Sequence, residues 1–532
     1  MSSQWFTQLS GFAETRPDLL AGVQRGIEKE SLRVDENGML SQTPHPESLG
    51  AALTHSQITT DYSEALLEFI TSVSTSIEGT LETMENIHSF VSRELGDELL
   101  WGASMPCIVA GDAGIPIARY GSSNVGRMKS VYRLGLGNRY GRMMQAIAGV
   151  HYNFSMPKDY WPLAQEADGA TDIPLQDYIT GRYLGLIRNF HRWSWLLIYL
   201  FGASPAVCAS FMRGRGEHHL EPFDEGSNSL HLPYATSLRM GDLGYNSSAQ
   251  KSLRVCYNSL DNYLATLTSA ILTPHEDYAK FQGKDDGEYM QLNDSLLQIE
   301  NEFYSTIRPK HPAQSGETAL TALNMRGIEY VEVRCVDVNP FEPLGISEEQ
   351  IRVIDSFLLY CLTQDSPACD EPLQLRQARN LSAVVNRGRE PGLMLEDDEE
   401  SRSLESWANE LLDGIAECAV ALDAANSADS YTAAIAAQRP KLNDPEQTPS
   451  ARVLREMREK SLPFSALALS YSKQWARHFR ERPLSEEKIA ELREESTTSL
   501  ARQSEIESAD AISFEDYLAA YYEQYKVIGT GD

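Results

Sequence analysis

The chain has 532 residues, which is enough for two to four domains or for one large enzyme core with added helices. Its 42% hydrophobic and 23% charged residues are typical of a globular protein and exclude disorder as the overall state. The formal net charge of -30, from 76 acidic residues against 46 lysines and arginines, argues against binding to nucleic acid or to an anionic membrane surface.

The sequence also favours a reducing compartment. Its 7 cysteines are scattered without a Cys-x-x-Cys spacing, which argues against a disulfide framework and against a structural zinc site. No basic segment followed by an apolar run opens the sequence, so no secretory signal is expected. The longest apolar run, residues 193–201, is too short to span a membrane and predicts a buried helix end. We therefore expect a cytoplasmic protein.

The first acidic motif follows a short predicted helix that ends at Gly22. Residues 26–34 predict a strand, and alternate side chains of a strand share a face, so Glu28 and Glu30 point the same way, about 7 Å apart. Two such carboxylates repel each other unless a cation lies between them. A divalent metal site and a solvated strand edge both remain open interpretations of this segment alone.

A second acidic candidate lies within residues 53–71. Glu68 is enclosed by the apolar residues 66, 67, 69 and 70, and a carboxylate is costly to bury there unless it is paired or binds a metal. The alternative is the solvent side of an edge strand. Asp61 is close enough in sequence to reach the same site. Ser76 then predicts the N-cap of an amphipathic helix.

Residues 116–157 reverse the charge of the rest of the chain. They contain no Asp or Glu, but they carry Arg119, Arg127, Lys129, Arg133, Arg139 and Arg142. Such a segment is typical of a place that receives an anionic ligand, such as phosphate or carboxylate. Within it, residues 144–155 alternate apolar and polar side chains and predict a strand, with His151 on the polar face. His151 is either a ligand or a structural hydrogen-bonding group.

Three further segments matter for the site. Residues 176–201 predict one long helix that ends at Gly202. Arg239, near Tyr245, suits bidentate binding of a substrate carboxylate, or it is a surface arginine. Residues 327–340 predict a strand that places Glu332 and Arg334 on one face, as ligands for a metal and its phosphate or as an ordinary ion pair.

The C-terminal part differs in character. Ser347 predicts the start of a core helix. Beyond residue 385 an acidic run at 396–400 is followed by an amphipathic helix and then by further helical patterns as far as Tyr525, without a recognisable chemical motif. We predict a catalytic α/β core over 1–385 and a mainly helical region over 386–532 packed on it.

Taken together, the predicted strands offer five ligands beside an arginine-rich segment. Oxygen ligands with one imidazole suit several Mg²⁺ ions and a polyphosphate better than one zinc ion. The expected fold is α/β (α+β), with a largely antiparallel sheet flanked by helices, whose concave face holds metal and nucleotide.

These segments also resemble a known family. Residues 26–34, 53–71, 120–157, 232–245, 298–310 and 327–341 are similar, as long strings, to the proteobacterial glutamate–cysteine ligases, also called γ-glutamylcysteine synthetases. The similarity covers about residues 20–360 in register and the helical C-terminal part more loosely. It implies a glutamine-synthetase-like sheet and ATP-dependent joining of the L-glutamate γ-carboxylate to the L-cysteine amine through γ-glutamyl phosphate, the first step of glutathione synthesis.

The resemblance also implies roles for individual residues. Mg²⁺, with Mn²⁺ as an alternative ion, is expected at Glu28, Glu30, Asp61, Glu68, His151 and Glu332. Arg133 and Arg334 are expected to hold the nucleotide and stabilise the transferred phosphoryl group, and Arg239 to receive the glutamate α-carboxylate. The cysteine pocket is expected to be formed by Tyr132, Gln145, Tyr245, Tyr304 and Tyr62, the last standing where many relatives have Phe.

The general base that takes the proton of the cysteine amine is not evident, and Asp61 is the candidate. A monomer with feedback inhibition by glutathione is expected, and Cys107 has no evident disulfide partner. The alternatives are a ligase of the same scaffold that uses another amine, a metal-dependent hydrolase, and a non-catalytic metal- or nucleotide-binding regulator.

Overall fold

The computed structural model describes residues 4–213, 218–226, 228–243, 253–285, 287–397 and 400–528. Tyr245 lies outside these ranges. The centre of the molecule is a seven-stranded sheet in the order β11-β12-β5-β1-β3-β2, with β4 paired to β1. Its strands are β1 (Gln24–Val34), β2 (Ile58–Thr60), β3 (Leu66–Ile70), β4 (Leu99–Leu100), β5 (Val150–Ser155), β11 (Ile307–Lys310) and β12 (Tyr330–Val336). Every pairing is antiparallel, which confirms the predicted α/β fold with an antiparallel sheet.

One face of the sheet is covered by the helices α3 (Ile77–Glu94), α6 (Leu175–Trp193) and α10 (Glu348–Thr363). The strand side chains that meet them, such as Ile27, Tyr152 and Val333, are fully buried, as period-two alternation requires. The predicted caps are present, since Ser76 accepts a hydrogen bond from the Gly79 N–H and Ser347 accepts one from the Gln350 N–H. Alternate strand residues therefore point to the opposite face, where the acids lie.

That opposite face is covered by α4 (Asn124–Tyr140), which contains most of the acid-free segment. The segment therefore forms a helix that brings its cations over the sheet. Ser123 caps the helix by accepting a hydrogen bond from the Gly126 N–H, and Gly141, at φ 83°, ends it.

Three sequence predictions were wrong in detail. The N-terminal helix is divided into α1 (Gln4–Thr15) and α2 (Pro17–Ala21), because a proline starts a helix but is not tolerated inside one. The helix predicted over 176–201 is α6 followed by α7 (Trp195–Phe201), with the break at Ser194.

The strand predicted over 144–155 begins only at Val150, and residues Met143–Ala146 form a 3₁₀ turn. The backbone explains the late start. The Gln145 N–H donates to the Arg142 carbonyl, and the Gly149 N–H donates to a side-chain oxygen of Glu30 at 2.6 Å and not to the backbone of the neighbouring strand. The alternation of apolar and polar residues over 144–149 therefore does not correspond to a strand.

The remaining helices are α5 (Tyr160–Ala167), α8 (Leu260–Leu272), α9 (Ala319–Arg326), α11 (Glu371–Arg387), α12 (Leu404–Asn426), α13 (Ser430–Ala436), α14 (Arg439–Asn443), α15 (Pro449–Glu459), α16 (Phe464–Glu481), α17 (Glu486–Ala509) and α18 (Phe514–Val527). Small sheets are formed by β6 (Ala206–Cys208), β8 (Ser229–His231) and β7 (Glu221–Pro222), by β9 (Lys284–Asp285) and β10 (Glu288–Tyr289), and by β13 (Met394–Asp397) and β14 (Glu400–Ser403).

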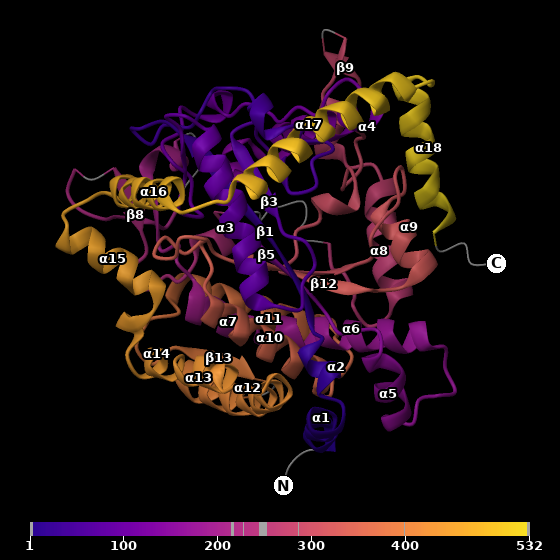
Figure 1. The fold of residues 1–532 in the computed structure, drawn as a ribbon, viewed down its shortest axis with the longest axis vertical. Helices are drawn as coiled ribbons and strands as arrows, with labels where there is room; N and C mark the ends of the chain where they lie inside the picture. The colour runs from indigo at the N-terminus through magenta and orange to yellow at the C-terminus, as the bar shows by residue number, and fades with distance from the viewer. Residues whose placement is uncertain are drawn as a thin grey trace.

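The C-terminal helices wrap around the sheet (Figure 1). From α12 at the bottom of the view, the chain passes through α15 and α16 on the left and α17 near the top to α18 on the right. Trp407 of α12 packs on Trp195 of α7 with ring centroids 5.2 Å apart, and both belong to one large hydrophobic core with the sheet. A helical C-terminal part packed on the core is thus present, while a domain boundary at residue 385 stays a prediction.

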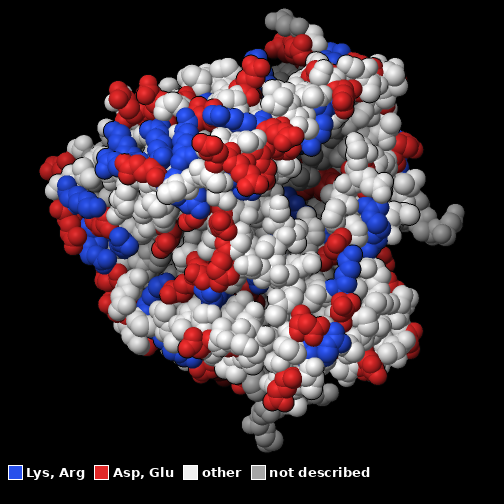
Figure 2. Space-filling model, viewed as in Figure 1, with Lys and Arg blue, Asp and Glu red and all other residues white. Residues whose placement is uncertain are grey.

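The surface in Figure 2 mixes charges of both signs, with lysine and arginine gathered around α16 at the upper left. All seven cysteines are free. Across the described ranges, no helix has both the length and the apolar character needed to cross a bilayer.

Candidate active site

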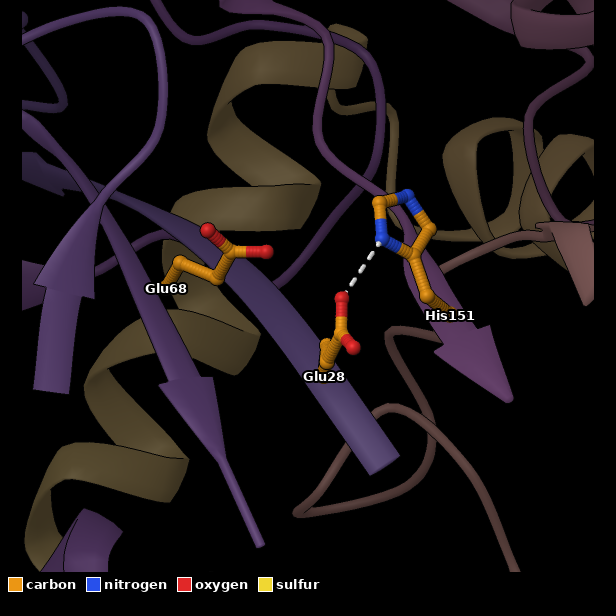
Figure 3. A group of neighbouring side chains, drawn as sticks. All are labelled: Glu28, Glu68 and His151. Carbon is orange, nitrogen blue, oxygen red and sulfur yellow. Dashed lines mark hydrogen bonds and ion pairs between the residues drawn. The ribbon is translucent and has the colours of Figure 1, made fainter. Parts of the chain in front are cut away.

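The acidic residues meet on three adjacent strands. In the antiparallel register, Glu30 of β1 lies opposite Glu68 of β3, and Glu28 lies opposite His151 of β5. Directly opposite residues place their side chains on the same face of a sheet, within reach of one another. Figure 3 shows Glu28, Glu68 and His151 reaching toward one shared space, and their potential ligand atoms all lie within 4.8 Å of one another.

His151 is the centre of this cluster. Its Nδ1 atom lies 3.4 Å from Glu28 Oε2 and 3.7 Å from Glu332 Oε1, and its Nε2 atom lies 3.9 Å from Glu30 Oε1. Glu332 comes from β12, where it pairs with Asn153 of β5. Three of the predicted metal ligands therefore surround the imidazole of a fourth, with Glu68 beside them, and the solvated-edge interpretation of Glu28, Glu30 and Glu68 is wrong.

The electrostatics divide the carboxylates into two pairs. Burial and the neighbouring charges raise the pKa of Glu68 well above its usual value, and burial raises the pKa of Glu30 in spite of His151 and two arginines. Burial also acts on Glu28 and Glu332, but His151 with Lys310 lowers the pKa of Glu28, and Lys310 with Arg334 lowers that of Glu332 well below its usual value. The four carboxyl groups therefore differ in how readily they ionise.

A divalent cation fits this set of residues. Glu332 is 1% exposed, and its Oε2 atom accepts no hydrogen bond within the described ranges, although the Lys310 ammonium lies 3.1 Å away. Such a buried acceptor, with like-charged carboxylates beside it, is typical of an oxygen-rich site for Mg²⁺ or Mn²⁺. A single imidazole among carboxylates is also compatible with these ions.

A cavity of about 430 Å³ opens above the cluster. Its floor carries Glu28, Glu68, His151 and Glu332, and cations surround it: Lys129 and Arg133 from α4, Arg308 and Lys310 from β11, and Arg334 from β12. The Arg334 Nη1 atom lies 3.2 Å from Glu332 Oε1. One compartment thus combines acids that can hold metal with bases that can hold phosphate.

Asp61 and Arg133 meet at the edge of this cavity. The Arg133 Nε–H donates to the Asp61 carbonyl, its Nη2 atom lies 4.0 Å from the Asp61 carboxylate, and its guanidinium packs 4.5 Å from the Tyr120 ring centroid. Its Nη1–H also donates to the Lys129 carbonyl at 3.0 Å, so several contacts orient Arg133 in the cavity wall.

The four described candidates for the amino-acid pocket all line the same cavity, namely Tyr62, Tyr132, Gln145 and Tyr304. The Tyr62 hydroxyl has no hydrogen-bond partner in the part of the chain that the structure describes. A buried hydroxyl without a partner is available to a ligand.

Arg239 lies beneath the cavity wall and is not among the residues that line it. It is 2% exposed, donates to the Arg334 carbonyl at 2.8 Å and lies 3.8 Å from Asp337. The surface interpretation of Arg239 is therefore wrong, and a direct contact with substrate stays a prediction.

Comparison with known proteins agrees with this geometry. A family model described as "Glutamate-cysteine ligase" matches residues 9–384. A curated glutamate–cysteine ligase of Pseudomonas paraeruginosa is 50% identical over 521 residues, covering 98% of this chain and 97% of that protein. The chain belongs to the glutamate–cysteine ligase family. A relative of the same name from Alcanivorax borkumensis is 50% identical over 508 residues, 94% of this chain and 96% of its own.

Solved structures support the same membership. The glutamate–cysteine ligase of Francisella tularensis, in complex with AMP, superposes with a TM-score of 0.88 at 37% identity, covering 95% of this chain and 98% of that one. A bifunctional glutathione synthetase from Pasteurella multocida has a TM-score of 0.68 at 24% identity over 89% of this chain and 55% of its own, which shows a shared fold.

Several cavity residues of this family member were missed from sequence. Arg308 and Lys310 occupy alternate positions of β11 and pair with Glu332 and Tyr330 of β12, so period-two alternation within the 298–310 segment could have placed them on the site face. Lys129 was noted for its charge only. Tyr517 and Tyr521 of α18 had no detectable signal, because nothing in a C-terminal amphipathic helix says which part of the fold it covers.

Proposed function

We propose that this chain joins the γ-carboxylate of L-glutamate to the amine of L-cysteine, using ATP and giving γ-glutamylcysteine, ADP and phosphate. The observation that carries the proposal is the cavity itself, in which a buried acid–imidazole cluster faces a set of cations. The family membership supports the choice of this reaction among those that such a site allows.

The reaction requires activation of a carboxylate. An oxygen of the glutamate γ-carboxylate attacks the γ-phosphorus of ATP and ADP leaves, which gives γ-glutamyl phosphate. The cysteine nitrogen then attacks the acyl carbon, phosphate leaves, and the nitrogen loses a proton. The first step brings two anions together, so cations must offset their repulsion, and the proposed cations are Arg133, Arg334 and Lys310, which line the cavity.

The acid cluster is the proposed metal site. Glu28, Glu30, Glu68, His151 and Glu332, with Asp61 at the edge, would hold Mg²⁺ or Mn²⁺. When bound there, the metal supplies positive charge to the phosphate oxygens and orients them. Because Glu28 and Glu332 have lowered pKa values, these two remain ionised and ready to bind a cation near neutral pH.

The tyrosine-lined part of the cavity is the proposed cysteine pocket. Tyr62, Tyr132, Gln145 and Tyr304 would surround the small substrate, and Arg239 would attract the glutamate α-carboxylate from beneath the wall. Asp61 is the proposed acceptor of the amine proton. Cytoplasmic location, a monomeric state and inhibition by glutathione complete the proposal.

The test is ADP release by the purified chain with ATP and Mg²⁺, measured with both amino acids and with each one omitted. We expect turnover only when both are present and no turnover after the metal is chelated. Turnover that is unaffected by omitting either amino acid would refute the proposal. Replacing cysteine with 2-aminobutyrate, which lacks the sulfur, measures how strongly the pocket selects for the thiol. The same experiment tests for a ligase that uses another amine.

A further inference from the structure

The last helix of the chain forms part of the cavity wall. Tyr517 and Tyr521 of α18 line the same cavity as the acid cluster, although α18 lies far beyond residues 9–384 that match the family model. In Figure 1, α18 stands on the right of the molecule, next to α8 and α9 and below the end of α17. The cavity is therefore closed by a segment that the family model does not cover.

A small hydrophobic cluster holds α18 in place. Phe514 and Leu518 pack with Met128 and Val131 of α4 and with Leu292 and Ile299, apart from the main core. This packing fixes one side of the helix against α4. Tyr517 and Tyr521 follow these two residues by three positions, so they lie on the adjacent side of the helix, which lines the cavity.

Hydrogen bonds fix the rotation of the helix. The Tyr522 hydroxyl donates to the Gln298 carbonyl at 2.8 Å, and the Tyr525 hydroxyl donates to Glu300. The Gln298 side-chain amide in turn donates to the Tyr132 carbonyl at 3.2 Å. Helix α18 is thus anchored to the segment that also supports α4, so its cavity-facing rings have a defined position.

The two cavity-facing rings lie nearly parallel to each other. Tyr517 and Tyr521 are one helical turn apart, with ring centroids separated by 6.5 Å and ring planes inclined by only 26°. Both are half-buried. The cavity residues include the apolar Val125 and Met128 of α4 together with the side-chain amide of Asn301. Aromatic and apolar side chains with an amide in the same cavity suit a planar, nitrogen-rich ring.

Among the three proposed substrates, only one has such a ring. Glutamate and cysteine are small charged molecules, and the phosphates of ATP are assigned in the proposed function to Arg133, Lys310 and Arg334, which line the cavity. The adenine base is planar, aromatic and uncharged, and it extends away from the phosphates. We propose that Tyr517 and Tyr521 form the surface against which the adenine base of ATP lies, so that α18 is part of the nucleotide site. This inference rests on the proposed function.

The test uses the full chain with Tyr517→Ala, Tyr521→Ala and the double variant. KM values for ATP, glutamate and cysteine are measured, and AMP binding to the enzyme without other substrates is measured by calorimetry. We expect a rise of about five- to one-hundred-fold in the ATP KM and the AMP Kd, as for loss of a stacked base, with the other two KM values unchanged. Tyr521→Phe keeps the ring and should bind AMP like the wild type.

Two controls separate stacking from helix docking. Glu523→Ala alters an exposed residue of the same helix and should change nothing in AMP binding. A Tyr517→Leu, Tyr521→Leu variant keeps apolar packing without an aromatic face, so it should retain the wild-type melting temperature and still lose AMP affinity.

Unchanged ATP KM and AMP Kd in the alanine and leucine double variants would overturn the inference, as would a shift in the cysteine or glutamate KM alone. A wild-type chain that makes no γ-glutamylcysteine would instead refute the proposed function, so the two failures are distinguishable.

Discussion

A buried ion pair behind the active site offers a quantitative test of the fold. Asp355 of α10 is fully buried and accepts hydrogen bonds from Arg25 of β1 at 3.0 Å and from the Tyr152 hydroxyl of β5 at 2.6 Å. The Arg25 guanidinium also donates to the Thr75 carbonyl. The pair therefore ties the two strands that carry Glu28 and His151 to the helix layer.

Asp355→Asn conserves volume and removes only the charge that Arg25 needs. Breaking one side of a buried ion pair leaves an uncompensated charge and costs about 3–5 kcal/mol. We expect the lower end, about 3 kcal/mol, because the amide oxygen can still accept from Arg25. The measurement is the urea midpoint of unfolding at pH 7, followed by circular dichroism.

The matched control removes both charges. An Arg25→Met, Asp355→Leu, Tyr152→Phe variant replaces the network with apolar groups of similar size, which is often close to neutral for stability. It should be more stable than Asp355→Asn alone. A loss below about 1 kcal/mol in the single variant, or a triple variant that is less stable than the single one, would refute the reasoning.

Three further outcomes are expected. Glu332→Gln should abolish synthesis while the circular dichroism spectrum shows that the fold is kept, and wild-type turnover would remove Glu332 from the metal site. Burial lowers the pKa of His55 to about 4, and its Nδ1 atom accepts two backbone N–H bonds. Between pH 6.5 and pH 4 the unfolded state therefore binds a proton that the folded state does not, so the free energy of unfolding should fall by about 3 kcal/mol over this range. His55→Asn keeps a hydrogen-bond acceptor but does not titrate, so it should make the free energy of unfolding depend less on pH. An unchanged pH dependence in this variant would contradict the reasoning. Gly135→Ala would place a Cβ atom 2.1 Å from the Gln298 side-chain oxygen. It should therefore lower the free energy of unfolding by about 1–3 kcal/mol, although alanine favours helices. A more stable variant would show that the Gln298 side chain moves freely.

Local patterns in the sequence were sufficient to predict which charged side chains share a face of the sheet. The two-residue alternation of a strand determines which side chains share a face, so Glu28 with Glu30 and Glu332 with Arg334 were correctly paired from sequence alone. The capped helices at Ser76 and Ser347 were also predictable, because a cap depends only on residues within one turn. The family resemblance rested on these same local strings.

Only the tertiary structure decided how these faces meet. The register of β1 with β3 and β5 places Glu68 and His151 opposite Glu30 and Glu28, and no local pattern specifies which strands become neighbours. The acid-free segment proved to be a helix over the site, and the C-terminal α18, several hundred residues away in sequence, closes the cavity. Contacts between such distant segments depend on the packing of the whole chain, so they could not be read from either segment alone.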